Sequence, residues 1–137
     1  MNILFFFTPK AEVAYVDQAD SLRQVLEKME HHGYTAIPLL SNEGKYIGTI
    51  TEGDLLWKMK GDGFPDIHKL QNISILDVPR RRDNQAVKID ENMENLFEKV
   101  KNQNFVPVVD DKNTFIGIVT RKDALSYLAK QVKKAQQ

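Results

Sequence analysis

The chain has 137 residues with 19 basic and 19 acidic side chains, so its formal net charge is zero, which argues against a strongly basic nucleic-acid binder. It contains no cysteine, which excludes disulfide frameworks, thiolate metal sites and cysteine nucleophiles. With 42% hydrophobic and 28% charged residues, the composition is typical of a globular protein that buries one core without metals.

The N-terminal segment starts with a five-residue apolar run, Ile3–Phe7. A secretory signal needs an apolar stretch of roughly 7–15 residues behind a positive region, and a membrane span needs about 20. The run is too short for either. We therefore expect it to pack on the core of a cytoplasmic protein that has no membrane partner.

The first half of the chain predicts the order strand, helix, strand, strand, helix. A short alternating segment at Val13–Val16 precedes a helix with apolar residues three and four positions apart, behind an N-cap at Ser21. Two β-rich runs joined by a turn follow at 34–40 and 45–51, and a second helix comes next. The glycines and proline of residues 61–72 predict a linker.

The second half predicts the same order of elements. An alternating segment at Val87–Ile89 precedes a helix with the apolar residues Met93, Leu96, Phe97 and Val100. Two β-rich runs at 104–109 and 114–120 and a closing helix follow. Four residue pairs lie 69 positions apart, namely Pro38 and Pro107, Gly48 and Gly117, Thr51 and Thr120, and Asp54 and Asp123. We therefore expect an internal duplication.

The predicted division is repeat 1 at residues 1–60, a linker at 61–72 and repeat 2 at 73–137. Each half is small for an independent core, and two halves packed through their sheets would bury each other's apolar faces. The expected fold is α/β of the α+β type, with two pseudo-twofold-related β-α-β-β-α repeats in one domain.

The motif Gly–apolar–apolar–Thr–x–x–Asp occurs twice, at Gly48–Asp54 and Gly117–Asp123. In each copy a strand ends at the threonine and a helix begins, and a helix N-terminus offers free N–H groups that suit a phosphate. The aspartate one turn later can accept the hydroxyls of a ribose, as acidic residues do in dinucleotide sites. The motif therefore suits a nucleoside phosphate.

The same motif also fits a purely structural role. Thr-x-x-Asp before an apolar helix is close to a capping box, in which the two side chains satisfy backbone N–H groups at the start of the helix. A duplicated cap is still a cap, so the motif by itself leaves both interpretations open.

The complete repeated unit resembles the CBS domain, and the tandem resembles a CBS pair, or Bateman module, over about residues 3–130. The stretches Gly33–Pro38 and Thr120–Lys122 are also similar to small stand-alone CBS-pair receptors for cyclic di-AMP in Firmicutes. The resemblance implies a sensor that binds AMP, ADP, ATP, S-adenosylmethionine or cyclic di-AMP in clefts between the repeats, and that often forms a homodimer.

Carried onto this sequence, the resemblance implies two clefts that each combine residues of both repeats. The first takes Val13, Ala14, Tyr34, Thr35, Ala36 and Pro38 with Ile118, Thr120, Arg121, Lys122 and Asp123. The second takes Thr49, Thr51 and Asp54 with Val87, Phe105, Val106 and Pro107.

We expect the first cleft to bind an anionic adenine nucleotide more tightly. There Ala36 leaves room for an adenine, and Arg121 and Lys122 can meet phosphates, for which arginine is especially well shaped. In the second cleft Phe105 replaces the alanine and Glu52-Gly53 replaces the two cations, so the pocket is tighter and less cationic.

Other residues add little chemistry. His31 and His32 point about 100° apart on a helix, so we expect solvated histidines and no metal site. The run Arg80–Arg82 is either an exposed loop or an arm that reaches a phosphate or a partner. Trp57 and Phe64 are expected to pack. No grouping of a nucleophile with a base emerges, so an enzyme is not expected.

The sequence thus predicts a non-catalytic regulatory module that has no catalytic cofactor, takes an adenine nucleotide as ligand, and signals to an unidentified effector protein. The alternative is a ligand-free structural or interaction module whose Thr-x-x-Asp units only cap helices. The partners expected for the sensor are a small adenosine-containing molecule, a second copy of the chain and the effector, with no nucleic acid.

Overall fold

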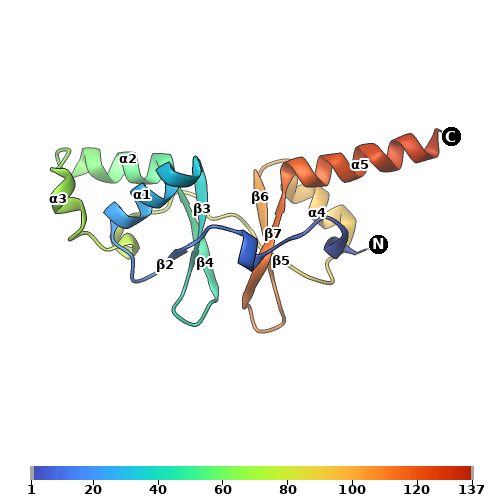
Figure 1. Cartoon of the computed structure of the whole chain (residues 1–137), viewed down its shortest axis with the longest axis horizontal. Coiled ribbons are helices and arrows are strands. Elements are labelled where there is room, and N and C mark those ends of the chain that lie inside the picture. The colour runs from blue at the N-terminus through green and yellow to red at the C-terminus, as the bar shows by residue number, and fades with distance from the viewer. Residues whose placement is uncertain (1, 137) are drawn as a thin grey trace. The chain divides into compact units, whose positions relative to one another are not determined.

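The computed structural model describes residues 2–136, which form two sheets and five α-helices of a mixed α+β fold (Figure 1). The fold class expected from the sequence is thereby confirmed. The chain divides into two compact units. The repeat-1 unit is Ala14–Asp83, and the repeat-2 unit combines residues 2–13 with residues 84–136.

The repeat-1 unit contains a three-stranded sheet in the order β2-β3-β4. Strand β2 (Val16–Asp17) runs parallel to β3 (Ala36–Leu40), which pairs antiparallel with β4 (Tyr46–Thr51). Helices α1 (Leu22–His32), α2 (Glu52–Gly61) and α3 (Ile67–Leu70) complete the unit.

Helix α1 forms where its capping signals predict it. Ser21 accepts a hydrogen bond from the Gln24 amide and the Gln24 side chain accepts one from the Ser21 amide, which completes a capping box. The helix ends at Gly33, whose φ of 68° is the left-handed conformation that glycine adopts without strain. Its apolar stripe, represented by Val25 and Met29, is buried against the sheet.

The segment after α2 stays on the repeat-1 unit. The Leu22 amide donates to Ile73 O at 2.8 Å, and the Ile75 amide donates to Asp20 O at 3.0 Å. Leu70, Ile75 and Val78 are buried in the same apolar cluster as the helix and strand residues of this unit. The lead-in to the second repeat, including the 3-10 turn Ile75–Asp77, therefore packs on the first.

The repeat-2 unit contains a four-stranded sheet in the order β1-β7-β6-β5. Its strands are β1 (Thr8–Pro9), β5 (Val87–Lys88), β6 (Phe105–Val109) and β7 (Phe115–Thr120). Helix α4 (Met93–Val100) and the longer α5 (Arg121–Ala135) belong to the same unit (Figure 1). Short 3-10 turns at Ile3–Phe5 and Lys10–Glu12 flank β1.

The N-terminal segment packs only in part as expected. Ile3 is fully buried in the core of the repeat-2 unit, whereas Leu4 and Phe5 are exposed. Strand β1 pairs antiparallel with β7 through Thr8 and Ile118. The first residues of the chain thus complete the sheet of the second repeat.

The duplication extends to the strand register. In the repeat-1 unit Ala36 lies opposite Thr51 and Pro38 opposite Thr49, and in the repeat-2 unit Phe105 lies opposite Thr120 and Pro107 opposite Ile118. Each hairpin carries its irregularity at the same place, between Leu39 and Leu40 and between Val108 and Val109. The matched register places each Thr-x-x-Asp unit in the same position on its own sheet.

Some element bounds differ from those predicted. The strand predicted at Val13–Val16 forms as β2 over Val16–Asp17 only. The stretch predicted as a linker contains the short helix α3. The contact units also divide the chain differently from the predicted repeat boundaries, because residues 2–13 join the second repeat and residues 61–83 join the first.

Candidate functional site

The Thr-x-x-Asp unit of repeat 1 is a complete capping box. The Thr51 hydroxyl accepts from the Asp54 amide at 3.1 Å, and Asp54 Oδ2 accepts from the Thr51 amide at 2.9 Å. The other carboxylate oxygen, Asp54 Oδ1, accepts a hydrogen bond from the Arg81 amide at 3.1 Å. Asp54 is only 2% exposed, so this carboxylate is buried and already serves backbone donors. The capping interpretation is confirmed for this copy.

The residues around Arg81 form a strap, defined here as Arg80–Asp83, that lies over β4. Asp83 Oδ1 accepts from the Thr49 amide at 2.9 Å and from Arg80 Nε at 2.8 Å. A Cβ on Gly48 would collide with the Asp83 carboxylate and with Arg80, so the glycine permits this close approach.

The Arg80–Arg82 run is therefore not simply an exposed loop. Arg80 forms an ion pair with Asp83, and the Arg81 guanidinium lies 4.9 Å from the centre of the Trp57 ring. Trp57 is 43% exposed and Phe64 is 64% exposed, so the two side chains expected to pack are not buried. Trp57 instead provides a surface for the cation of Arg81.

The Thr-x-x-Asp unit of repeat 2 is more open. The Thr120 hydroxyl accepts from the Asp123 amide at 3.0 Å and caps α5. Asp123 is partly exposed, and its carboxylate has no hydrogen bond or ion pair within residues 2–136. The capping interaction therefore uses the backbone of Asp123 and leaves its side chain available.

Two cations follow Thr120 in the first turn of α5. Arg121 Nε donates to Val100 O at the end of α4, at 2.8 Å, which fixes the base of the guanidinium. The Arg121 amide donates to Asn104 O at 2.9 Å, just as the Glu52 amide donates to Thr35 O at 3.0 Å in repeat 1. Lys122 is exposed. This helix start thus combines a carboxylate with two positive charges.

The predicted residues of β3 and its approach differ in accessibility. Thr35 is exposed and Tyr34 and Ala36 are partly exposed, whereas Pro38 is buried. The Tyr34 ring lies 5.4 Å from that of His32, centre to centre. Ala36 and Thr51 are register neighbours, so the small side chain borders the helix start of its own repeat.

The corresponding residues of repeat 2 lie deeper. Val87 and Val106 belong to the apolar core of their unit, and Phe105 is 6% exposed. Pro107 is buried as well, and Ile118 opposite it is partly exposed. Because these valine and proline side chains are buried in packing, they provide no polar group for a ligand.

Two further predicted residues lie in different units. Val13 is 8% exposed in the repeat-2 unit, and Ala14, partly exposed, begins the repeat-1 unit. Thr49 is buried, with its hydroxyl 2.7 Å from the Tyr46 hydroxyl. Each predicted cleft draws on both units, and the pairing of residues across the units stays a prediction.

Sequence reasoning missed several polar residues of the site region. Asp83 and Gln103 are two polar side chains for which the sequence pattern predicts no role. Gln103 is 5% exposed and bonds Gln85 through both ends of its amide, at 2.8 and 3.1 Å. Each side chain also has a partner far along the chain, Thr49 for Asp83 and Gln85 for Gln103, and no local pattern predicts these long-range bonds.

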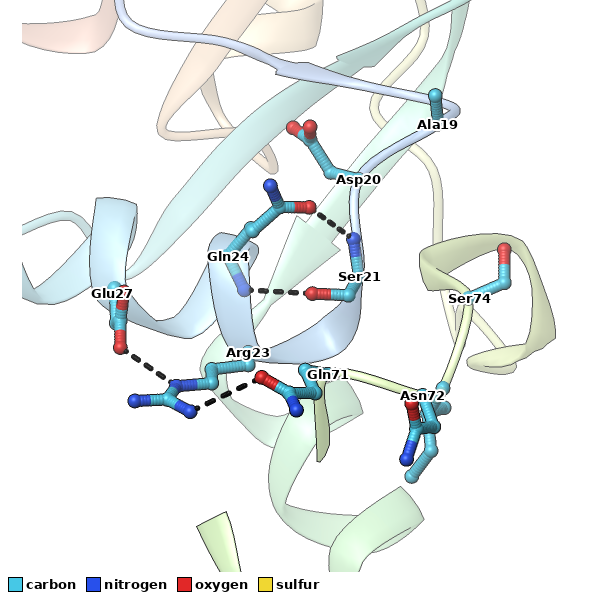
Figure 2. Close-up of a pocket in the computed structure, with 10 residues that line it drawn as sticks. Ala19, Asp20, Ser21, Arg23, Gln24, Glu27, Gln71, Asn72 and Ser74 are labelled. Atoms are coloured by element: carbon cyan, nitrogen blue, oxygen red, sulfur yellow. Dashed lines mark hydrogen bonds and ion pairs between the residues drawn. The ribbon is translucent and has the colours of Figure 1, made fainter. Parts of the chain in front are cut away.

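A polar groove of about 660 Å³ lies elsewhere on the repeat-1 unit (Figure 2). It runs between the start of α1 and the segment after α3, where Arg23 bonds both Glu27 and Gln71. Ser21 and Gln24 on its wall are the capping box of α1 (Figure 2). Its polar groups therefore already serve the structure, and none of the predicted site residues lines it.

A second groove of about 500 Å³ is mainly apolar and lies between α1 and α2. Tyr34 is the predicted site residue that lines it, beside Leu26, Leu56 and Met59.

Within residues 2–136 no cluster of three metal-ligating side chains occurs. The helices of the same stretch are too short or too polar to cross a membrane.

Two stretches of the chain, residues 7–61 and 75–130, match the model of the CBS domain family. The chain therefore belongs to the CBS domain family and carries a tandem pair of these domains.

Relatives in the family are known by sequence. Cyclic di-AMP receptor B of Bacillus subtilis is 29% identical over 133 residues, which cover 93% of this chain and 86% of that protein. Cystathionine beta-synthase of Saccharomyces cerevisiae is 30% identical over 85% of this chain, which spans only about a quarter of that protein, 26%.

Solved structures agree with this assignment. The CbpB protein of Listeria monocytogenes, in complex with c-di-AMP, superposes with a TM-score of 0.82 at 26% identity, covering 96% of this chain and 97% of CbpB. CBSX2 in complex with AMP gives a TM-score of 0.75 at 23% identity, covering 96% of this chain and 98% of CBSX2, which supports the fold alone. CbpB and CBSX2 are each covered almost completely by this chain.

Proposed function

We propose that the chain is a non-catalytic regulatory module that binds an adenosine-containing ligand and passes the signal to a partner protein. The observation that carries this proposal is the helix start at Thr120–Asp123. An unpaired carboxylate and two cations share one turn there, which suits the ribose and the phosphates of a nucleotide.

The ligand contacts that we propose are those of the first predicted set. Asp123 accepts the ribose hydroxyls, the Thr120 hydroxyl faces a phosphate, and Arg121 and Lys122 neutralise it. Because Val100 O holds Arg121 through Nε, the two Nη groups stay oriented for a bidentate contact. Ala36 and its neighbours on β3 are assigned to the adenine.

Cyclic di-AMP is the ligand we favour. Two relatives that align over most of their own length carry it in their names or complexes, the receptor of Bacillus subtilis and CbpB of Listeria monocytogenes. AMP, ADP, ATP and S-adenosylmethionine remain in the test because each presents the same adenosine group. Action in the cytoplasm, a homodimeric state and a separate effector protein are further parts of the proposal.

A thermal-shift and calorimetric screen of the full chain tests the proposal directly. A ligand that binds only the folded state stabilises it by about 2.7 kcal/mol at a hundredfold excess over its dissociation constant. We expect cyclic di-AMP to raise the midpoint and Asp123→Ala to weaken its binding at least tenfold. No shift with any adenosine compound would contradict a sensing role.

The matched control is Asp111→Ala. Asp111 lies in an exposed turn of the same unit, and its substitution by alanine removes the same charge from the chain. Equal loss of binding in both variants would mean that only net charge matters, and the assignment of Asp123 would then be wrong.

A second function, a ligand-free interaction module, has one observation in its favour, since Asp54 is a buried helix cap. It predicts that neither Thr-x-x-Asp unit responds to nucleotide. Chemical-shift mapping with cyclic di-AMP separates the two, because sensing requires changes at the Thr120–Asp123 amides.

A further inference from the structure

The two copies of Thr-x-x-Asp have different chemical surroundings in this chain. Asp54 is 2% exposed and its two oxygens accept from the Thr51 and Arg81 amides. Asp123 is partly exposed and its carboxylate accepts no hydrogen bond within residues 2–136. Only the second copy therefore offers an acceptor that a ribose hydroxyl could reach.

The strap Arg80–Asp83 contributes to this difference, beside the Thr51 amide that completes the capping box of repeat 1. Its Arg81 amide occupies Asp54, and its Asp83 carboxylate occupies the Thr49 amide on β4. Gly48 lets the strap lie directly against the strand, since any Cβ there would collide with Asp83. The strap thus supplies the hydrogen-bond partners that a bound nucleotide would otherwise supply.

Side-chain contacts hold the strap in place on two sides. The Arg80–Asp83 ion pair closes its ends over β4, and Arg81 lies on the Trp57 ring of α2. Arg80 is the more buried of the ion pair, with 21% of its side chain exposed. The strap is therefore a folded element of the repeat-1 unit.

The segment that covers β7 in repeat 2 is arranged differently. Strand β1 pairs with β7 at Gly117 and Ile118, with Thr8 O and the Phe7 ring against Gly117. Within residues 2–136 no hydrogen bond or ion pair joins this segment to the carboxylate of Asp123. The N-terminal segment therefore seals the strand and leaves the helix start open.

We propose that the Arg80–Asp83 strap is a built-in occupant of the repeat-1 Thr-x-x-Asp unit, and that it restricts the chain to one nucleotide, held at Asp123. This inference rests on the proposed nucleotide-binding function and specifies which of its two candidate units works. Asp54 is a structural latch for the strap, and Asp83 and Arg81 determine the stoichiometry.

Stoichiometry and paired substitutions test the proposal. Titration of the full chain with AMP, and separately with cyclic di-AMP, gives one site per chain. Asp123→Asn weakens that site at least tenfold, whereas Asp54→Asn, which keeps an acceptor oxygen for the strap, changes it less than twofold. Two sites in the wild-type chain, or equal losses in the two variants, would overturn the proposal.

A double variant, Asp83→Ala with Arg81→Ala, releases the strap from Thr49 and Trp57. A second, weaker AMP site then appears. The matched control, Asp77→Ala with Arg82→Ala, changes the same residue types at exposed positions, leaves Arg81 and Asp83 in place and keeps one site. A released strap that still leaves one site would count against its role as occupant.

Amide hydrogen exchange on the wild-type chain keeps the test independent of how well any variant folds. The Thr49 and Arg81 amides are protected without ligand and stay protected when cyclic di-AMP saturates the chain. Loss of their protection on binding would show that ligand displaces the strap and would overturn the inference. A wild-type chain that binds neither nucleotide would instead overturn the proposed function itself.

Discussion

Asp54 and Asp123 show how one residue type at equivalent positions acquires two roles. Both follow a capping threonine by three positions, and both amides donate to that threonine's hydroxyl. The two carboxylates differ in their donors, since Asp54 accepts from the Thr51 and Arg81 amides and is buried, whereas the Asp123 carboxylate has no such partner within residues 2–136. Burial and a backbone partner favour a structural role, and exposure without a partner favours ligand contact.

Stability measurements distinguish these roles. Asp54→Ala leaves the Thr51 and Arg81 amides without an acceptor, so we expect a loss of roughly 2–4 kcal/mol of the free energy of unfolding. Asp123→Ala removes an exposed carboxylate near a helix start and should cost less than about 1 kcal/mol. Urea unfolding followed by circular dichroism measures both, and similar losses would contradict the latch assignment.

At the scale of elements, the hairpins β3–β4 and β6–β7 are the duplicated parts, and the two repeats differ in the segment that lies against each hairpin. The strap Arg80–Asp83 contacts β4 through the Thr49 amide, and β1 pairs with β7 at the edge of its hairpin. Gly48 and Gly117 mark the two close approaches, since a Cβ at either position would collide with the covering segment.

Substitution of Gly48 tests the contact between strand and strap. Gly48→Ala forces the Asp83 and Arg80 side chains aside, and we expect it to destabilise the chain by about 1–3 kcal/mol. Gly61→Ala, where nothing lies within 4 Å of the added methyl group at the end of α2, should be neutral or stabilise by up to about 1 kcal/mol. Thermal midpoints of the two variants compare them directly, and a Gly48→Ala protein as stable as wild type would mean that the strap does not lie on β4.

At the scale of the whole molecule, chain order and spatial grouping differ. The first residues belong to the repeat-2 unit, and residues 61–83 belong to the repeat-1 unit. Each unit has its own apolar cluster, and Ile3 is part of the cluster that contains Leu96 and Val119. Loss of the N-terminal segment should therefore weaken the second repeat and not the first.

Ile3→Ala tests whether the N-terminal segment stabilises the second repeat. Ile3 is fully buried, so its truncation should cost about 2–5 kcal/mol and should expose the amides of β5–β7 to exchange before those of β2–β4. Leu4→Ala, at a neighbouring residue that is 53% exposed, is the control and should leave both sets unchanged. Preferential loss of protection in β2–β4 would contradict the grouping.

The neutral net charge of the chain also has a measurable consequence. Any attraction for an anionic ligand must come from local cations such as Arg121 and Lys122 and not from the whole molecule. Affinity for cyclic di-AMP should therefore fall several-fold between about 50 mM and 500 mM salt, as exposed charges are screened. Arg121→Gln should make the affinity less dependent on salt. An unchanged salt dependence would mean that Arg121 does not contact the phosphate.

Local patterns in the sequence determined much of this protein. The capping residues Ser21, Thr51 and Thr120 act on amides three positions away, so a short window suffices to find them. The apolar spacing of Met93, Leu96, Phe97 and Val100 predicts a helix, and α4 forms there. The repetition at an offset of 69 residues identified the family, because each repeat builds the same hairpin and helix start.

Only the tertiary structure decided which copy of the motif is open. Asp54 meets the Arg81 amide across 27 positions, Thr49 meets Asp83 across 34, and Thr8 pairs with Ile118 from the opposite end of the chain. Such contacts depend on which segments the folded chain brings together, and a backbone N–H donor is the same in every residue type except proline. The sequence therefore determined two equivalent sites, and long-range packing made them unequal.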